Sequence, residues 1–381
     1  MQVLNVVKYY YPSKGGMETF VQILCEGLYK KGIQSTIIAI NHKRSWFDSY
    51  ELINHLSVYR TNNIFKILSQ PLSLSLGKKF IKIIGNFDLI HVNCPFPNAE
   101  IYYKYLKKKP LVITWHADPS MTRWNKLIPL YRIALNKILQ HAERIVVTSP
   151  NLLNYSPSLF PYKNKCVIVP LPFCMQNKGL NHLNNSFMNS RILFKDVPTI
   201  LFVGALRPYK GLRYLIRAMC HIKSANLKII GTGEEEKSLI KLVKNLGLQS
   251  RVSFLGNVTD EELVRYYQES YLFVLPSIAP SEAFGIVQLE AMSFGLPVIN
   301  TDLLSGVPFV SLNNITGFTV PPRDEYSLAN AINCLINDHA LYRKFSNNAL
   351  TRSSMFSEDK VVSSYLNIYE DCIKSYNMRY K

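Results

Sequence analysis

The chain has 381 residues, of which 48% are hydrophobic and 18% are charged, and its formal net charge is +18. This composition excludes a disordered chain, and the length exceeds what one ordinary hydrophobic core requires, so we expect two domains. No apolar run reaches the roughly 18 residues that a membrane-spanning helix needs. The first residues lead directly into a strand, so no signal peptide is expected.

The positive charge is concentrated in the first half of the chain. Residues 1–190 hold 23 Lys and Arg against 8 Asp and Glu, whereas the remaining residues hold 21 against 18. Clusters such as Lys78-Lys79-Lys82 and Lys107-Lys108-Lys109 suit an anionic lipid surface. Nucleic acid is the competing partner, but no nucleic-acid-binding motif supports it, and a solvated basic surface is the third interpretation. The seven scattered cysteines predict reduced thiols in the cytosol, with neither a disulfide framework nor a zinc site.

The first half alternates strand and helix patterns, which predicts a parallel, doubly wound sheet. Gly15 and Gly16 lie at the turn from the first strand into an amphipathic helix, whose first turn carries Glu18. A phosphate can approach the bare backbone of such a turn, although a plain turn also favours glycine. His116 and Asp118 follow the strand PLVITW, at the same sheet edge as Gly15. Asp118 and His91 are weaker candidates than His116, the latter because a strand-terminal histidine is commonly only packed.

A polar, Asn-rich segment, residues 174–196, is predicted to be the linker to a second strand–helix series. The segment GTG at residues 231–233 follows a strand, but glutamates occupy the place of the third glycine of a dinucleotide fingerprint. After the strand TILFVG, the loop ALRPYKG carries Arg207 and Lys210, which can neutralise a diphosphate. Alternatively, Arg207 and Lys210 are ordinary basic surface residues beside the start of a helix.

The most informative stretch is PSIAPSEAFGIVQLEAMSFGLPVINT, residues 276–301, which predicts a loop, a helix and a strand. Amides at Phe284, Gly285 and Ile286 would begin the helix and are suited to phosphate. Glu282 before them and Glu290 after them can accept hydrogen bonds from hydroxyl groups. Together these amides and carboxylates suit a sugar-diphosphate nucleotide. The alternative is that Glu282 only interacts with the helix dipole and that Glu290 lies on a solvated face of the helix.

The run SEAFGIVQLEAMSFGLPV resembles the signature of the retaining glycosyltransferases of family 4, and the resemblance covers nearly the whole chain. It implies an α/β GT-B fold, in which two Rossmann-like doubly wound domains face a cleft. The expected domains are residues 1–173 with a returning helix at about 362–381, and residues 197–361, joined by the linker 174–196.

The resemblance also assigns roles to the candidate residues. Segments YPSKGGMET and TWHAD imply that Gly15 and Gly16 contact the donor diphosphate and that His116 lies near the acceptor hydroxyl and the transferred sugar. Glu282 would hold the donor sugar and Glu290 the ribose, while backbone near Gly233 and Val258 would read the base. The family usually places Arg directly after the strand glycine; here Ala205 follows Gly204, so Arg207 is expected to serve from a shifted position.

The resulting expectation is a retaining enzyme that moves a hexose from a GDP- or UDP-linked sugar to a lipid-linked or polysaccharide acceptor, such as O antigen or capsule. No metal or other cofactor is expected, and we expect a cytoplasmic protein, peripheral at the inner membrane face. Aromatic residues expected at the surface fit that acceptor: Tyr9, Tyr10, Tyr11, Tyr102, Tyr103, Trp115 and Trp124. Two other classes remain open: an NAD-dependent oxidoreductase on Rossmann domains, and a non-catalytic scaffold that binds nucleotide sugars.

Overall fold

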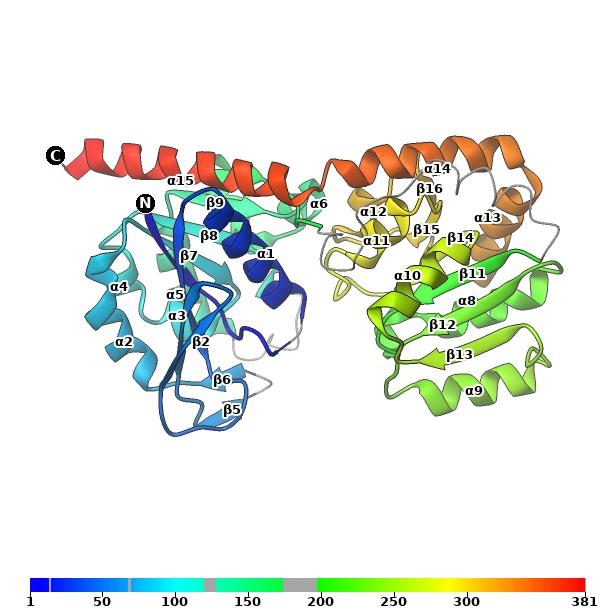
Figure 1. Cartoon of the computed structure of the whole chain (residues 1–381), viewed down its shortest axis with the longest axis horizontal. Helices are drawn as coiled ribbons and strands as arrows, with labels where there is room; N and C mark the ends of the chain where they lie inside the picture. Colours follow the sequence, from blue (N-terminus) through cyan, green and yellow to red (C-terminus); the bar gives the residue numbers. More distant parts are fainter. Residues whose placement is uncertain (14, 68–69, 120–127, 174–196, 381) are drawn as a thin grey trace. The chain divides into compact units, whose positions relative to one another are not determined.

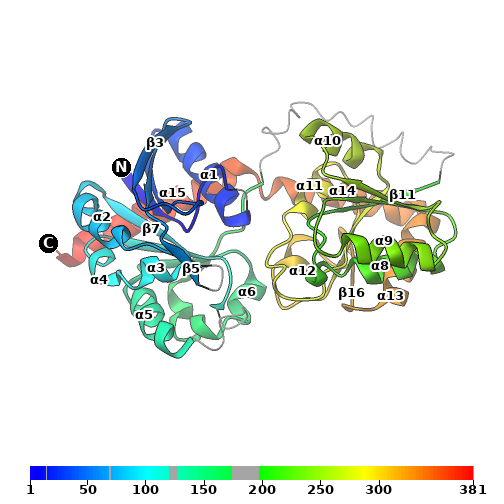
Figure 2. The same ribbon diagram turned by 90° about the horizontal axis from the view of Figure 1, so that it is seen from below.

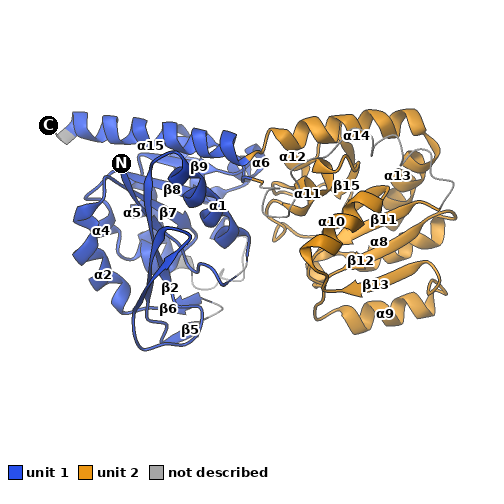
Figure 3. Ribbon diagram, viewed as in Figure 1, with its two compact units in different colours: residues 1–172, 358–381 blue, residues 173–357 orange. Residues whose placement is uncertain are grey.

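The computed structural model describes residues 1–381 except 14, 68–69, 120–127, 174–196 and 381 (Figure 1). The chain divides into two compact units (Figure 3). Unit 1 comprises residues 1–172 and 358–381, and unit 2 comprises residues 173–357. The expected linker 174–196 and the expected surface residue Trp124 lie outside the described residues.

Unit 1 is built on an eight-stranded sheet in which every neighbouring pair is parallel except β3–β4. From one edge to the other the strands are β10 (Cys166–Ile168), β9 (Arg144–Val147), β8 (Leu111–Trp115), β7 (Leu89–Cys94), β1 (Gln2–Val6), β2 (Gln34–Ile40), β4 (Leu56–Thr61) and β3 (Ser49–Ile53). The chain order therefore reverses between β1 and β7, as in doubly wound folds.

Helices cover both faces of this sheet (Figures 1 and 2). Helices α2 (Ser75–Ile83), α3 (Pro97–Glu100) and α5 (Ile128–His141) share one core with alternate residues of the central strands. Helices α1 (Gly16–Lys30) and α15 (Glu358–Tyr380) pack together on the other face. The remaining helical segments are α4 (Tyr103–Leu106), α6 (Pro150–Asn154), η1 (Ile84–Asn86) and η3 (Pro157–Lys165).

The contact between α15 and the sheet is polar as well as apolar. His91 is fully buried, with Nε2 2.7 Å from Thr114 Oγ1 and Nδ1 2.7 Å from the Tyr369 hydroxyl. The hydroxyl of Tyr365 lies 2.9 Å from the same Thr114 oxygen. Buried polar groups are retained when they find partners, so His91 is a structural link between the sheet and the returning helix.

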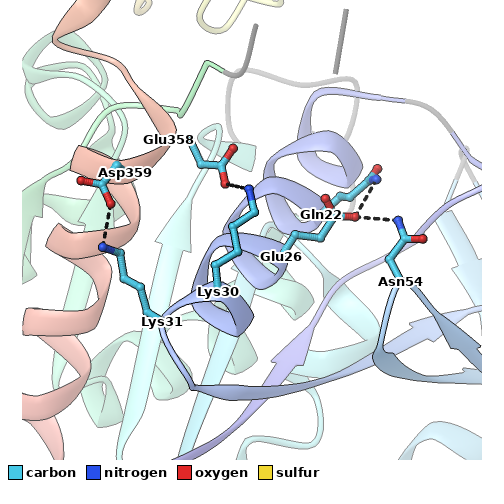
Figure 4. Close-up of polar contacts among 7 residues, drawn as sticks. All are labelled: Gln22, Glu26, Lys30, Lys31, Asn54, Glu358 and Asp359. Carbon is cyan, nitrogen blue, oxygen red and sulfur yellow. Dashed lines mark hydrogen bonds and ion pairs between the residues drawn. The ribbon is translucent and has the colours of Figure 1, made fainter. Parts of the chain in front are cut away.

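Ion pairs join the start of α15 to the end of α1 (Figure 4). Lys30 Nζ lies 2.7 Å from Glu358 Oε1, and Lys31 Nζ lies 2.6 Å from Asp359 Oδ1. A side chain at Gly27 would lie 2.5 Å from Val362, so glycine permits the close approach of the two helices. The carboxyl-terminal helix is thus integrated into unit 1 although it follows unit 2 in sequence.

The edge of the sheet beyond β2 contains a hairpin. Its strands β3 and β4 meet at Asn54 and His55, whose φ angles of +47° and +68° belong to a tight two-residue turn. Glycine usually occupies such turns. Because this turn contains no glycine, its sequence does not indicate a hairpin. A second hairpin, β5 (Phe65–Ile67) with β6 (Gln70–Leu72), follows.

Unit 2 has a six-stranded, all-parallel sheet in the order β13 (Val252–Gly256), β12 (Asn226–Ile230), β11 (Thr199–Val203), β14 (Leu272–Leu275), β15 (Val298–Thr301) and β16 (Gly317–Val320). Chain order reverses between β11 and β14. Its helical segments are η5 (Pro208–Lys210), α8 (Leu212–Ala218), η6 (Met219–His221), α9 (Glu236–Asn245), α10 (Asp260–Glu269), α11 (Val287–Ser293), α12 (Val307–Val310), α13 (Glu325–Asn337) and α14 (His339–Ser354). No sequence pattern described above predicts α14.

Candidate active site

The candidate site of unit 2 lies where the strand order of its sheet reverses. Lys210 follows β11 and Glu282 follows β14, the two strands that flank the reversal. In open α/β sheets the loops after these strands diverge and leave room for a ligand at the carboxyl edge. Strand order therefore brings together two loops that are far apart in the sequence.

A backbone hydrogen bond and a close backbone packing contact join the two loops. The Ile278 amide donates a 2.8 Å hydrogen bond to the Tyr209 carbonyl. Gly211 has a φ of +68°, and a side chain there would collide with the Pro276 carbonyl oxygen. Glycine at this position relieves both the backbone strain and the collision.

Lys210 and Glu282 form a buried ion pair. Lys210 Nζ lies 2.5 Å from Glu282 Oε2, and each side chain is 10% exposed. The Ser277 hydroxyl donates a 3.0 Å hydrogen bond to the same carboxylate oxygen. Because an ammonium group has three N–H donors, Lys210 retains donors for an anion while it stays paired with Glu282. The second oxygen of Glu282 has no hydrogen-bond partner within the described residues.

Glu290 is positioned by a tyrosine that no sequence motif marks as functional. The Tyr267 hydroxyl donates a 2.8 Å hydrogen bond to Glu290 Oε2. Tyr267 is fully buried on α10, and its ring stacks on Phe294 at a centroid distance of 5.3 Å. Burial, followed by the neighbouring Glu290, raises the pKa of Tyr267 well above its usual value. The tyrosine is therefore a neutral donor that holds the carboxylate in place.

The segment between the two glutamates has the sharp backbone turn that its sequence implies. Gly285 has a φ of +69°, and a side chain there would lie 2.7 Å from Leu275 and 2.8 Å from Gln288. Helix α11 begins at Val287, so the Gly285 and Ile286 amides precede it. Phe284 is buried and packs edge-on against Phe356 at 6.2 Å.

A buried amide pair, also unmarked in the sequence, supports this segment. Gln288 Nε2 donates to the carbonyls of Phe284 and Val307 at 3.4 and 3.3 Å. Asn300 Nδ2 donates to Gln288 Oε1 at 2.8 Å. These bonds tie the turn before α11 to the end of β15 and to α12, which fixes the position of the amides beside Glu282.

In unit 1, His116 follows β8 and is held by its neighbours. Its Nε2 lies 3.0 Å from Asn93 Oδ1, and Asn93 Nδ2 donates to the Val6 carbonyl at 3.2 Å. The Asn93 amide directs its nitrogen toward the Val6 carbonyl and therefore its oxygen toward the His116 ring. An amide oxygen only accepts hydrogen bonds, so Nε2 of His116 carries the proton. Burial lowers the pKa of His116 to about 3. The ring is therefore neutral near pH 7, with Nδ1 as a hydrogen-bond acceptor.

Comparison with known proteins decides the family. Residues 14–173 match the model of Glycosyltransferase Family 4, and residues 185–352 match that of Glycosyl transferases group 1. O-antigen chain mannosyltransferase C of Escherichia coli is 31% identical over 381 residues, which cover 98% of this chain and 100% of that protein. The chain belongs to the family 4 glycosyltransferases.

One further relative supports this assignment, and one solved structure shows the same fold. D-rhamnosyltransferase WbpZ of Pseudomonas aeruginosa is 30% identical over 88% of this chain and 86% of that protein. The solved structure of a glycosyltransferase from Rickettsia africae has a TM-score of 0.77 at 21% identity, with 98% of each chain covered. The expected GT-B fold and the expected enzyme class, a glycosyltransferase, are therefore confirmed.

In this family 4 glycosyltransferase the glycines expected near the base serve backbone packing. A side chain at Gly233 would collide with the backbone of Leu206, and the Gly231 amide donates to the Gly256 carbonyl at 2.7 Å. Val258, in the loop after β13, is half-buried. The contacts of Gly233 and Val258 with a nucleotide base stay predictions.

Arg207 and Ala205 are both exposed in the loop after β11. Within the described residues no carboxylate pairs with Arg207, which stands at the start of η5. Arg207 differs from the buried, paired Lys210 in its freedom to move. Its exposed guanidinium group can turn toward a ligand, whereas the Lys210 side chain is already oriented. The shifted role expected for Arg207 stays a prediction.

The Gly15–Gly16 turn carries an acidic side chain close to its backbone. Helix α1 begins at Gly16, and the carboxylate of Glu18 occupies the place that a side chain of Gly15 would take. Burial raises the pKa of Glu18, and Lys8 opposes that shift. A diphosphate bound to these amides requires Glu18 to turn away, because two anions repel each other.

Asp118 is fully buried, and it accepts hydrogen bonds from the Ser158 amide and hydroxyl at 3.1 and 3.2 Å, which anchors η3. A functional role for Asp118 stays a prediction. The expectation for two of the aromatic residues is corrected. Tyr10 and Trp115, expected at the surface, are fully buried, whereas Tyr11 is 49% exposed. Side chains alternate between the two faces of a strand, and Trp115 lies on the face that shares a core with α5, so it is buried.

Among the described residues, no group of three or more His, Cys, Asp or Glu lies in an arrangement that could hold a metal ion. No helix among these residues has the length and apolar character needed to cross a membrane.

Proposed function

We propose that this glycosyltransferase retains the anomeric configuration and moves a hexose from a GDP- or UDP-linked sugar to a lipid-linked or polysaccharide acceptor at the cytoplasmic membrane face. The observation that carries the donor assignment is the buried Lys210–Glu282 pair at the point of strand reversal. It supports the proposal because the Lys210 ammonium group can contact a diphosphate while the Glu282 carboxylate accepts hydrogen bonds from sugar hydroxyls.

In this proposal the donor is held chiefly by unit 2. Lys210, Arg207 and the amides at Phe284, Gly285 and Ile286 stabilise the charge that develops on the leaving diphosphate. Such preorganised donors are usually the largest contribution to catalysis because they need no rearrangement during the reaction. Gly15 and Gly16 of unit 1 add amides once Glu18 has turned away.

The two glutamates bind hydroxyl groups. Glu282 has one oxygen engaged by Lys210 and Ser277, which leaves the other for hydroxyls of the donor sugar. Glu290, fixed by Tyr267, accepts from the ribose. Neither carboxylate attacks the anomeric carbon, so the paired-carboxylate chemistry of glycosidases does not apply.

His116 acts as a neutral group. With Nε2 committed to Asn93, its Nδ1 accepts a hydrogen bond from a hydroxyl of the donor sugar or of the acceptor. A pKa of about 3 removes the option of an imidazolium at neutral pH. Orientation of a hydroxyl is the role that this electrostatic state supports.

The hexose and the acceptor class rest on relatives and on charge. The two similar proteins are described as an O-antigen chain mannosyltransferase and a D-rhamnosyltransferase, and both names refer to six-carbon sugars. A lipid-linked surface glycan, such as O antigen or capsule, is the acceptor that these relatives and the basic unit 1 favour. GDP-linked and UDP-linked donors both remain within the proposal.

The membrane face proposed for unit 1 is formed by α2 and α4, which are neighbours (Figure 1). Lys78, Lys82 and Lys104 are exposed on these helices, and Lys107 and Lys108 follow α4. Leu74, Ile81 and Ile101 are exposed among them by 62%, 56% and 57%. Basic residues beside exposed apolar ones suit an anionic bilayer surface. Lys79 is engaged elsewhere, with its ammonium 3.9 Å from the Tyr59 ring centroid.

Calorimetric titration of the full chain with UDP-, GDP-, dTDP- and ADP-sugars tests the donor assignment. We expect saturable binding of one sugar nucleotide and a loss of affinity of about tenfold or more in Lys210→Ala, since a charged hydrogen bond contributes roughly 1.5–3 kcal/mol. Lys241→Ala, an exposed lysine on α9 of the same unit, is the matched control and should bind normally.

Titration with NAD is the second control. Binding of NAD alone would favour the oxidoreductase alternative over the nucleotide-sugar assignment. Silence with every sugar nucleotide, repeated in the presence of an acceptor extract, would favour a scaffold and overturn the proposed transfer.

A further inference from the structure

Unit 1 has a surface pocket of about 330 Å³ at the sheet edge opposite to His116. Lys109 lies two residues before β8 and Arg144 is the first residue of β9, whereas His116 follows the other end of β8. The end of α5, the end of η3 and the last turns of α15 complete the lining. Ligand pockets commonly have volumes of about 300–1,000 Å³, so this one can hold a small group.

The lining is strongly basic. One carboxylate, Glu143, is present in the lining, and it is already paired with Arg379. The basic residues of the lining are Lys107, Lys109, His141, Arg144, Lys165 and Arg379. Burial lowers the pKa of His141, and Lys107 and Lys165 lower it further. Cations that face each other across a concave surface repel, which costs stability unless an anion lies between them.

Two of these cations are oriented by the fold. Lys165 Nζ donates to the carbonyls of Gln140 and Ala142, at the end of α5, at 2.6 and 3.0 Å. Arg144 Nη1 donates to the Glu143 carbonyl at 2.9 Å. One N–H of the ammonium and most of the guanidinium donors are left for a ligand. The two oriented cations thus come from two separate elements, η3 and β9.

We propose that this pocket binds a phosphate group, with Arg144, Lys165 and Lys107 as its principal donors. A phosphate carries up to two negative charges and several acceptor oxygens, which match a guanidinium fork and two ammonium groups. The group belongs either to a free phosphorylated molecule or to a phospholipid headgroup. The site is distinct from the donor site and does not rest on its assignment.

Titration calorimetry with inorganic phosphate at constant ionic strength tests the site in the full chain. We expect saturable binding that weakens about tenfold or more in Lys107→Gln/Arg144→Gln, because two charge-assisted contacts are lost. Lys241→Gln/Lys244→Gln, two exposed lysines of α9, provide the same change of net charge elsewhere.

A vesicle arm distinguishes the two sources. Phosphatidic acid vesicles are compared with phosphatidylserine vesicles of equal surface charge. A preference for phosphatidic acid that Lys107→Gln/Arg144→Gln abolishes identifies a lipid headgroup, whereas binding of free phosphate without this preference identifies a free ligand. Equal phosphate affinity in the wild type and in this double variant, with no lipid preference in either, overturns the proposal. Lys107→Gln alone, a change of one exposed side chain, repeats the test if the double variant does not fold.

Discussion

The hydroxyl of Tyr267 on α10 donates a 2.8 Å hydrogen bond to Glu290 on α11, and the tyrosine ring is fully buried beneath it. The bond connects a residue of the hydrophobic core to a carboxylate expected to bind the ribose. Core packing thereby determines the orientation of a binding group, and the contribution of the bond can be measured separately from that of the carboxylate.

Tyr267→Phe should weaken binding of the sugar nucleotide about three- to tenfold, because Glu290 loses the bond that orients it. The free energy of unfolding should fall by about 1 kcal/mol, the usual contribution of one hydrogen bond. Calorimetry and urea unfolding measure the two effects. Glu290→Ala should weaken binding further without unfolding the unit, and an unchanged dissociation constant in Glu290→Ala would remove this residue from the site. Tyr266→Phe, at the neighbouring half-buried position, is the control for loss of a hydroxyl.

The Lys210–Glu282 pair should show strong energetic coupling. Lys210→Met leaves a buried carboxylate without its cation, and loss of one partner of a buried pair costs about 3 kcal/mol. The double variant Lys210→Met/Glu282→Gln should lose less than the sum of the single variants, as residues in contact do. Urea unfolding of the four proteins measures the coupling. Lys228→Met, which breaks an exposed pair with Glu269, should cost under about 1 kcal/mol; additive effects at Lys210 and Glu282 would contradict a structural pair.

Two histidines should make the protein less stable in mild acid. The pKa values of His91 and His116 are lowered by burial from 6.5 to about 3. Between these pH values the unfolded chain binds more protons than the folded chain, so stability is lost as the pH falls below 6.5. Each histidine contributes a slope of up to about 1.4 kcal/mol per pH unit.

Urea unfolding between pH 7.5 and 5.5, roughly one unit either side of the ordinary histidine pKa, measures this slope. His116→Asn should reduce the slope, because one of the two groups is removed. A slope that is the same in this variant, or a His116 ring proton that titrates near pH 6.5 in nuclear magnetic resonance, would show that the ring is not held neutral.

The α2–α4 face should hold unit 1 at anionic bilayers. Lys78→Gln/Lys82→Gln/Lys104→Gln should lower the partition onto anionic vesicles by about tenfold or more, since each basic residue near such a surface contributes roughly 1 kcal/mol. Sedimentation with vesicles measures the bound fraction, which should also fall as salt screens the charges. A bound fraction equal to that of Lys241→Gln/Lys244→Gln would count against this face.

Sequence pattern alone was sufficient for the fold class and for most strands of both sheets. Buried parallel strands are short apolar runs, and those at 200–203, 227–230 and 272–275 are followed directly by loops rich in Gly, Pro and polar residues. The largely exposed edge strand β3 and the turn at Asn54 and His55 lack these signals. Strong local patterns were predictable for that reason, and the hairpin was not.

The sequence by itself also identified the candidate binding residues of unit 2. Lys210, Glu282 and Glu290 lie in loops or near helix starts after apolar strands. Tertiary structure alone decided which of them meet. The reversal of strand order pairs Lys210 with Glu282, and the helical phase of α10 selects Tyr267 over Tyr266 for Glu290. Periodicity reports which side of an element is apolar, whereas contacts between loops depend on strand order, which no local pattern encodes.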